Sequence, residues 1–445
     1  MNGQIIWFNM LDNNDIIKRR KKYLTPSFSL SYENPLHIVR GRGQYLYDSD
    51  GKEYLDAVNN ISHVGHCHPK VIEAANNQNQ KLNTNTRYLH DSILEYAQSL
   101  SQTLPDGLGV CYFTNSGSES NDLALRIARL YSESYESIVV SGAYHGHTSS
   151  LIEISPYKFL GPGGAGKPNF VHIIPMPDSF RGDHKLSDDT LEAYYIDILI
   201  DSVNKIKQRG KKLAFFMIEP IMGCGGQIII PSAFMKEAFK VVKNAGGLFI
   251  VDEVQIGLGR VGTHFWGFEM SGIIPDIITI GKSIGNGHPL SVVITKKHIA
   301  ESFNNGMEYF NSFGGNPVSC KIGQAVLNII NEEKLQKNAY KIGAYLLEGL
   351  KALKGKYNII GDVRGRGLFI GIELINNYEK MTPAAFEANI VVNQLRQKGV
   401  LISSDGPDHN VLKIKPPLVF NKNNADYFLE AFEYVLSDNK FKVQE

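Results

Sequence analysis

The sequence predicts an α/β fold, with a large domain built on a mostly parallel β-sheet and a smaller α+β domain after it. The first observation behind this prediction is that apolar runs typical of buried strands alternate with helical patterns between residues 111 and 282. The second is that three of these strands end on polar residues, Glu219, Asp252 and Lys282. The third is that the alternation stops near residue 326.

The composition is that of an ordinary globular protein. The chain has 445 residues, 43% apolar and 20% charged, and this length predicts one large and one smaller domain. A net charge of +1 indicates neither a nucleic-acid partner nor a membrane surface, and no apolar run is long enough to span a bilayer. The polar start with a basic cluster at 18–22 is unlike a signal peptide, and four scattered cysteines are typical of a reducing compartment. We therefore expect a cytoplasmic protein.

The N-terminal region predicts a short charged helix at 13–24 and a β-hairpin within 37–60 that turns at Asp50-Gly51. The segment 63–83 is a loop that leads into an amphipathic helix. We assign the chain to three parts: an N-terminal segment that joins the small domain, a large domain and a C-terminal small domain, at residues 1–64, 65–325 and 326–445.

Three histidines in the loop, His63, His66 and His68, raise the question of a metal site. The loop offers no carboxylate or thiolate partner at the spacing of a structural site, apart from Cys67. We expect these histidines to serve in packing and hydrogen bonding, and we expect no bound metal.

A strand at 111–113, a turn of small residues and a helix from Glu119 form the next pattern. Free backbone N–H groups and the helix dipole favour an anion at such a helix start. Gly117 would let a phosphate approach closely and Ser118 would add a hydroxyl, although a capped helix without a ligand has the same pattern. Tyr144 follows at a strand-to-loop junction, where its ring could stack on a flat heterocycle.

The strand at 277–280 leads through Gly281 into Lys282, and glycines follow at 285 and 287. A lysine at the end of a buried strand sits where desolvation disfavours its charged form, and the neutral amine forms Schiff bases with carbonyl compounds. A lysine that reaches solvent is the plain alternative.

The strand at 248–251 ends on Asp252, at the edge of the sheet where Lys282 is also expected. A carboxylate aimed at a pyridine nitrogen would keep that nitrogen protonated. A helix cap is the plain alternative for Asp252 alone, but an aspartate paired with a Schiff-base lysine predicts pyridoxal phosphate (PLP) as cofactor.

Two glycine motifs point to other nucleotide chemistry. Residues 161–167 match the phosphate loop G-x-x-x-x-G-K, but Pro168 follows instead of Ser or Thr and no strand leads in. Residues 257–262 match G-x-G-x-x-G, with Asp276 downstream, and would suit an NAD-linked dehydrogenase. A helix should then contain the third glycine, whereas an aromatic, glycine-broken segment follows. We expect neither site.

A glycine turn at 310–320 leads into a helix over 321–331, and the C-terminal α+β pattern begins near residue 326. After this helix we expect strands at 358–364 and 368–374, a helix at 383–398 and a last strand at 411–415.

These features together resemble the class III aminotransferase family of fold-type I PLP enzymes, from Leu46 to Phe420. The family implies the fold-type I PLP-dependent transferase fold and explains 257–262 as a family loop. The motifs that carry the resemblance are NSGSESN (115–121), YHGH (144–147), DEVQ (252–255), GLGRVG (257–262), GKSIGNG (281–287) and GGNP (314–317).

The resemblance implies roles for individual residues. Lys282 would carry the cofactor as a Schiff base, and Asp252 would face its ring nitrogen. The other implied contacts are Gln255 at the ring hydroxyl, Gly117 and Ser118 at the phosphate, Tyr144 and Val254 on the two ring faces, and Ser312 at the phosphate of the neighbouring subunit's cofactor. A homodimer with shared active sites is implied as well.

One departure from the family pattern concerns the substrate. Many relatives have an arginine three residues before Pro416-Pro417 that grips an α-carboxylate, and this chain has Lys413 there. A lysine lacks the bidentate fork of arginine, so the reacting amine would lie on a carbon without a carboxylate. Segments 59–69, 82–91, 149–159 and 408–417 are most similar to the ethanolamine-phosphate and 5-phosphohydroxylysine phospho-lyases.

The resemblance therefore implies a phospho-lyase that acts on O-phosphoethanolamine, a small phosphorylated amine. Arg87 and Lys413 are the candidates for binding the leaving phosphate, with plain surface solvation as the alternative for both. A class III (ω-amino acid) transaminase and a 5-phosphohydroxylysine phospho-lyase remain as alternatives.

Overall fold

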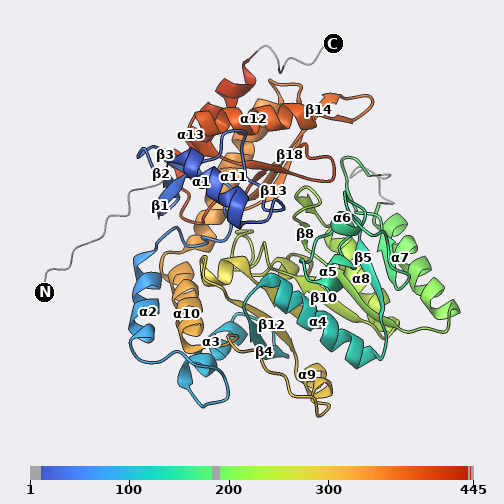
Figure 1. The fold of residues 1–445 in the computed structure, drawn as a ribbon. Coiled ribbons are helices and arrows are strands. Elements are labelled where there is room, and N and C mark those ends of the chain that lie inside the picture. The colour runs from blue at the N-terminus through green and yellow to red at the C-terminus, as the bar shows by residue number, and fades with distance from the viewer. Residues whose placement is uncertain (1–11, 183–190, 439–440, 442–445) are drawn as a thin grey trace, which may run out of the picture.

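The computed structural model describes residues 12–182, 191–438 and 441. A seven-stranded sheet forms the centre of its larger part (Figure 1). In spatial order the strands are β4 (Leu108–Thr114), β12 (Ser291–Lys296), β11 (Ile277–Ile280), β10 (Leu248–Asp252), β7 (Leu213–Ile218), β5 (Glu136–Val140) and β6 (Val171–Ile174).

The predicted mostly parallel sheet is confirmed. Strands β6, β5, β7, β10 and β11 run parallel to their neighbours in this group. Strand β12, which we did not predict, runs antiparallel to both β11 and β4. It lies between β11 and the edge strand β4, and it begins directly after the glycine-rich turn that follows Lys282.

Helices cover both faces of this sheet, and the alternation of side chains along β7 shows which helix lies where. Phe215 and Met217 pack in one cluster with α4 (Gly117–Ser132). Phe216 and Ile218 point to the other face and pack in the main core with residues of α7 (Leu191–Gln208) and α8 (Ser232–Asn244). Because both faces are buried, β7 is apolar along its whole length.

The strands of the C-terminal region belong to two smaller sheets. The first pairs β1 (Ile38–Arg42), β2 (Tyr45–Asp48) and β3 (Glu53–Asp56) with β16 (Val400–Leu401). The N-terminal segment thus pairs with the C-terminal part through β3 and β16. The second contains β13 (Ile360–Arg366), β14 (Phe369–Asn377), β18 (Val411–Ile414) and β17 (Ser403–Asp405), with β15 (Thr382–Pro383) beside β14.

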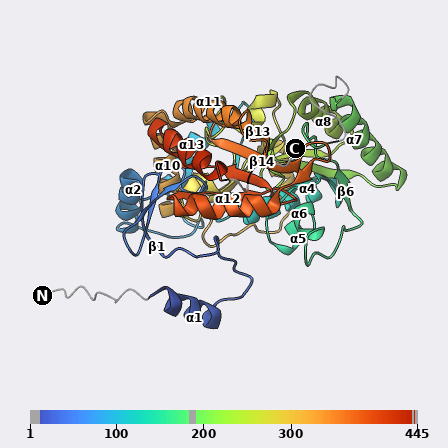
Figure 2. The same ribbon diagram turned by 90° about the horizontal axis from the view of Figure 1, so that it is seen from above.

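Helices complete the structure. Helix α1 (Asn13–Tyr23), which matches the predicted charged helix, buries no residue and lies apart from the body of the molecule (Figure 2). The other elements are α2 (Pro69–Asn79), α3 (Asp91–Ser101), α5 (Ser149–Ile152), α6 (Pro156–Phe159), β8 (Ile221–Met222), β9 (Ile228–Ile229), η1 (Gly267–Ser271), η2 (Lys282–Gly285), α9 (Lys297–Phe303), α10 (Pro317–Glu332), α11 (Leu335–Lys354), α12 (Ala385–Gln397) and α13 (Lys422–Leu436).

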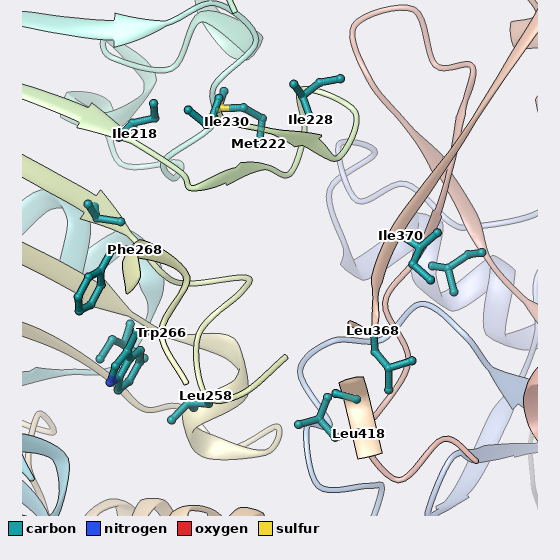
Figure 3. Close-up of a cluster of buried hydrophobic side chains, with 14 of the residues drawn as sticks. Ile218, Met222, Ile228, Ile230, Leu258, Trp266, Phe268, Leu368, Ile370 and Leu418 are labelled. Atoms are coloured by element: carbon teal, nitrogen blue, oxygen red, sulfur yellow. The ribbon is translucent and has the colours of Figure 1, made fainter. Parts of the chain in front are cut away.

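One hydrophobic core runs from the large sheet into the C-terminal sheet. Figure 3 shows part of it, in which Ile218 and Trp266 come from the large sheet's side and Ile370 and Leu418 from the C-terminal side. This shared core fixes the crevice at the carboxyl ends of the strands, where ligands bind in sheets of this kind. Within the described residues, no helix is long and apolar enough to cross a membrane.

Asp276, which accompanied the dinucleotide-like motif, is a structural residue. Its side chain is 1% exposed. The carboxylate accepts from Lys243 Nζ at 2.9 and 3.0 Å, from Lys296 Nζ at 2.9 Å and from the backbone N–H of Phe249 at 3.0 Å. It therefore joins α8, β10, β11 and β12.

Replacing Asp276 by alanine is expected to destabilise the protein by about 2–4 kcal/mol, because two lysines and a buried N–H group lose their acceptor. Thermal unfolding of the variant would measure this as a lower Tm. The matched control is Glu237→Ala, which breaks an exposed pair with Lys240; we expect at most about 1 kcal/mol there. Equal losses in the two variants would contradict the role of Asp276.

Candidate active site

The structure brings Asp252 and Lys282 together in one cavity. Asp252 ends β10, Lys282 follows β11, and these two strands are parallel neighbours. Twelve residues line the cavity: Ser116, Gly117, Ser118, Asn121, Tyr144, His145, Gly146, Glu219, Asp252, Val254, Gln255 and Lys282. All the cofactor residues predicted from the sequence, except Ser312, are among them.

Lys282 occupies a conformation that few residues with a side chain adopt. Its φ is +41°, in the left-handed region. Such strain is found mainly where the surrounding structure imposes it, often at functional sites. Lys282 opens η2, and Gly281 before it packs against Gly117, where an added Cβ would meet the Gly117 backbone at 3.2 Å. This close approach holds the lysine beside the start of α4.

Asp252 is buried and oriented by three donors. Its Oδ2 lies 2.9 Å from His145 Nδ1 and accepts from Asn121 Nδ2 at 2.9 Å. Its Oδ1 accepts from the backbone N–H of Val254 at 3.0 Å. The carboxylate thus has a fixed place on the wall of the cavity, and it brings a negative charge to a site that water barely reaches.

The start of α4 forms the anion-binding end of the cavity. Ser116 caps the helix, since its Oγ accepts from the Glu119 N–H at 3.1 Å. Ser118 Oγ lies 2.8 Å from His147 Nδ1 and accepts from the His147 N–H at 3.2 Å. The helix dipole and free N–H groups favour a phosphate here. Gly117 is needed for packing, because a Cβ would lie 2.9 Å from Val254 Cγ1.

Glu219 is a residue of the cavity to which sequence reasoning assigned no role. It follows β7, is 3% exposed, and its Oε2 accepts from the Gly223 N–H at 3.1 Å. Its Oε1 has no partner among the described residues. Burial, reinforced by the charge of Asp252, raises the pKa of Glu219 to about 7. A group that titrates near neutral pH inside a cavity is a candidate participant in chemistry.

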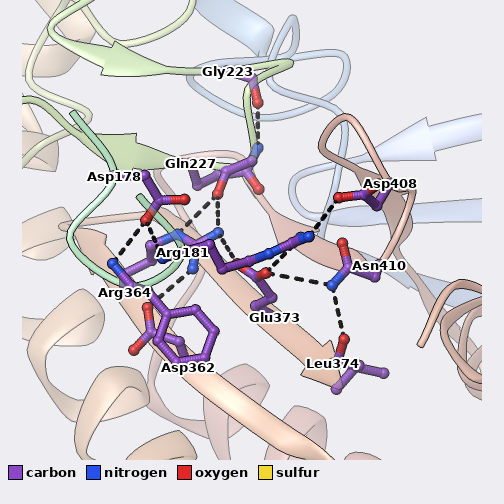
Figure 4. Close-up of polar contacts among 12 residues, drawn as sticks. Asp178, Arg181, Gly223, Gln227, Asp362, Arg364, Glu373, Leu374, Asp408 and Asn410 are labelled. Carbon is purple, nitrogen blue, oxygen red and sulfur yellow. Dashed lines mark hydrogen bonds and ion pairs between the residues drawn. The ribbon is translucent and has the colours of Figure 1, made fainter. Parts of the chain in front are cut away.

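The loop 223–227 closes the cavity behind Glu219. Arg364 on β13 donates to the carbonyl oxygen of Gly226 from Nε at 2.9 Å and from Nη2 at 2.7 Å. The carboxylate of Glu373 on β14 forms ion pairs with Arg364 at 2.7 Å and with Arg181 at 3.1 Å. Figure 4 shows how this network joins the small sheet to the loop. The loop is thereby held against Gln255.

The predicted substrate residues lie outside the lining of this cavity. Lys413 on β18 forms an ion pair with Asp405 at 3.2 Å. Arg87 pairs with Glu308 at 3.0 Å on the surface and lies over the ring of Phe310. Ser312 is exposed on the neighbouring loop. Their assigned roles stay predictions, and that of Ser312 depends on a second subunit.

The two glycine motifs, at residues 161–167 and 257–262, have structural roles. In residues 161–167, Lys167 Nζ donates to the carbonyl oxygen of Val171 at 2.9 Å, and the motif follows a short helix instead of a strand. In residues 257–262, Arg260 is fully buried and Nη1 donates to the carbonyl oxygens of Leu368 and Pro416, at 3.0 and 2.8 Å. Both segments hold neighbouring parts of the chain together.

The three histidines near residue 65 make separate contacts. His66 Nε2 lies 2.6 Å from Asp56 Oδ2. His63 lies 2.8 Å from the carbonyl oxygen of Leu258, and burial lowers its pKa to about 3, so it is neutral. His68 pairs with Glu333 at 3.1 Å. Among the residues that the structure describes, no three potential ligands gather in a way that could hold a metal ion.

The cavity fits pyridoxal phosphate. A helix start suited to the phosphate, a lysine amine and a buried carboxylate line one space, with Tyr144 and Val254 available as walls for the ring. Two buried polar atoms of the lining, Glu219 Oε1 and His145 Nε2, have no partner among the described residues. Both are open to a polar ligand.

Comparison with known proteins gives consistent matches. The profile of the family described as aminotransferase class III matches residues 28–436. A Drosophila melanogaster relative named alanine–glyoxylate aminotransferase 2-like is 46% identical over 433 residues, 96% of this chain and 88% of the relative. A Caenorhabditis elegans relative named ethanolamine-phosphate phospho-lyase homolog 1 is 40% identical over 95% of this chain and 93% of the relative. A solved phospholyase from Arthrobacter in complex with phosphoethanolamine matches with a TM-score of 0.91 and 37% identity, over 95% of this chain and 100% of that one.

Proposed function

The chain belongs to the class III aminotransferase family of PLP enzymes, and on this basis we propose that it is a phospho-lyase. Its proposed reaction converts O-phosphoethanolamine to acetaldehyde, ammonia and phosphate. The observation that carries the proposal is the lysine at position 413, where a carboxylate-binding arginine would favour amino acid substrates. The similar Arthrobacter structure, which holds phosphoethanolamine, supports the choice of substrate.

Ser118, Asp252 and Lys282 would each have a role in this reaction. The start of α4 with Ser118 would bind the cofactor's phosphate, and Asp252 would keep its ring nitrogen protonated. When bound, PLP supplies an aldehyde that bonds to amines and a ring that accepts an electron pair from the neighbouring carbon. Lys282, once its amine is released by the incoming substrate, would remove the proton from the carbon that bears the nitrogen.

The elimination step needs no second substrate, because the phosphate of the substrate is itself the leaving group. The C–O bond to the phosphate breaks, and its electron pair leaves on the phosphate oxygen. The two-carbon enamine that remains takes up a proton on carbon to become an imine, and one water hydrolyses this imine to acetaldehyde and ammonia. No keto acid takes part, and this separates the proposed lyase from a transaminase.

The test follows from that difference. Purified holoenzyme mixed with phosphoethanolamine alone is expected to release inorganic phosphate over many turnovers, as followed by a phosphate assay. Adding a keto acid should not increase the rate. If phosphate appears only in the presence of a keto acid, or never appears, the lyase proposal is wrong.

A transaminase is the second candidate, and the name of the Drosophila relative favours it. Amino group transfer from alanine to glyoxylate, measured on the same preparation, would identify this activity. Both lyase substrates carry an amine without a neighbouring carboxylate, so the argument from Lys413 does not distinguish them. A parallel reaction with 5-phosphohydroxylysine would show which of the two the enzyme converts.

We also propose a homodimer with shared active sites, located in the cytosol. Exposed apolar side chains flank Arg87 and Ser312: Leu89 is 103% exposed, Phe313 71% and Tyr88 68%. A patch of this kind favours contact with another protein surface. In a dimer, this surface would bring Arg87 and Ser312 to the partner's cavity. The four cysteines are free, in keeping with a reducing compartment.

A further inference from the structure

A buried lysine that no motif identified lies beside the cavity. Lys415 follows β18, and it is 2% exposed. Its Nζ donates to Gln255 Oε1 at 3.1 Å, and the ammonium lies 4.5 Å from the centre of the Phe369 ring. Because Gln255 lines the cavity, the amine of Lys415 is only one side chain away from it.

Lys415 and Lys413 lie near one shared carboxylate behind Gln255, outside the residues that line the cavity. Lys413 Nζ lies 3.2 Å from Asp405 Oδ2, and Lys415 Nζ lies 3.8 Å from the same oxygen. The two lysines therefore share one carboxylate, which leaves a net charge of about +1 when both are protonated. Asp405 is within hydrogen-bond distance of Lys413 only, so the surplus charge belongs mainly to Lys415.

The ammonium of Lys415 is also short of acceptors. An ammonium group has three donors, and the described residues provide one acceptor within hydrogen-bond distance, Gln255 Oε1. Burial lowers the pKa of Lys415 to about 8, with Lys413 and Lys282 acting in the same direction and Asp405 opposing them. A buried charge without full pairing is costly, and an arriving anion would relieve that cost.

We propose that Lys415 binds the phosphate group of the substrate and so selects phosphorylated amines over plain amines. This inference rests on the proposed function, which supplies a substrate with a phosphate. The cofactor's own phosphate is assigned to the start of α4, which leaves the side of the cavity at Gln255, with Lys415 behind it, for the second anion. A lysine suits a phosphate as a point charge.

The same position assigns Lys415 a task during elimination. When the C–O bond breaks, the electron pair moves onto the phosphate oxygen and the negative charge of the phosphate rises. A nearby ammonium in a low-dielectric site then stabilises the leaving group more strongly than the bound ester. Binding of the substrate and departure of phosphate both depend on this charge.

The experiment compares ligands with and without the phosphate. Holoenzyme is titrated with phosphoethanolamine and with ethanolamine, and the change in cofactor absorbance gives the Kd of each. In Lys415→Met the Kd for phosphoethanolamine should rise about 10- to 100-fold, because a charged hydrogen bond is lost. The Kd for ethanolamine should change by no more than about threefold, because ethanolamine carries no phosphate for Lys415 to bind. Lys415→Arg, which keeps the charge, should restore most of the affinity.

Controls separate this result from unfolding and from a general loss of charge. Lys422→Met removes an exposed lysine that pairs with Asp426 and should leave both Kd values unchanged. The cofactor spectrum and Tm of each variant report whether it is folded, and Lys415→Gln serves if Lys415→Met does not fold. A larger loss in Lys413→Met than in Lys415→Met would overturn the assignment to Lys415.

Phosphate release from the same samples distinguishes the two proposals. If wild-type enzyme releases phosphate but Lys415→Met keeps its preference for phosphoethanolamine, the role of Lys415 is overturned and the lyase stands. If wild-type enzyme releases none, yet its preference depends on Lys415, the lyase is overturned and the phosphate site stands.

Discussion

Replacement of Lys282 by alanine is expected to lower turnover of phosphoethanolamine by at least about 10⁴-fold. The variant loses both the amine that bonds to the cofactor's aldehyde and the base that moves the proton. The left-handed backbone at Lys282, with φ +41°, indicates that the fold places this side chain at the cavity at an energetic cost. Phosphate release measures the effect on turnover, and the visible absorbance of the purified protein reports the change in the cofactor.

Lys297→Ala is the matched control, because this lysine is exposed on α9. It should retain the turnover and the spectrum of the wild type. A Lys282→Ala protein that keeps more than about one hundredth of wild-type turnover would contradict the assigned role, since a base alone contributes about 10²–10⁴-fold.

Replacement of Asp252 by asparagine is expected to lower turnover by about 10²–10⁴-fold, with little effect on folding. Asparagine keeps the shape of the side chain and removes its negative charge, so a protonated ring nitrogen loses the partner that favours its charged form. The rate of phosphate release and the cofactor absorbance together measure this loss.

A comparison with Asn121→Ala tests whether the charge or the hydrogen-bond network matters. Asn121 donates to Asp252 and to the carbonyl oxygen of His145, so its loss would disturb the orientation of the carboxylate but not its charge. We expect a smaller decrease for Asn121→Ala than for Asp252→Asn. The reverse order would show that Asp252 acts mainly through position.

The parts of the site that the sequence predicted depend on short-range patterns. Asp252 and Lys282 follow apolar runs that are recognisable as strands, and parallel strands place their carboxyl ends at one edge of the sheet. Gly117 and Ser118 could be found in the same way, because a small-residue turn before a helix is visible in the sequence. The pairing of Asp252 with a Schiff-base lysine then predicted the cofactor, and the resemblance to the family supplied the roles of the other residues.

The parts that were missed depend on contacts between distant segments. Strand β12 is a short apolar run after a glycine-rich turn, and only its pairing with β4 and β11 identifies it. Lys415 was passed over because the family spacing pointed to Lys413. Residues two apart on a strand share a face, and this rule could have drawn attention to Lys415, but its bond to Gln255 is visible only in the fold.

Arg87 and Ser312 illustrate a different limit. The resemblance placed Ser312 at the partner's active site and Arg87 was a candidate for the leaving phosphate, whereas a single chain leaves both on the surface, with Arg87 paired to Glu308. Residues that complete a site in another subunit carry no local signal of that role. Their assignment depends on the proposed dimer.

The most direct test of the central claim is to find which residue carries the cofactor. Holoenzyme is reduced with borohydride, digested and analysed by mass spectrometry for a peptide bearing the reduced phosphopyridoxyl group. The account predicts this group on Lys282 and on no other lysine. A modified peptide that contains a different lysine, or no modified peptide from a protein that binds PLP, would contradict it.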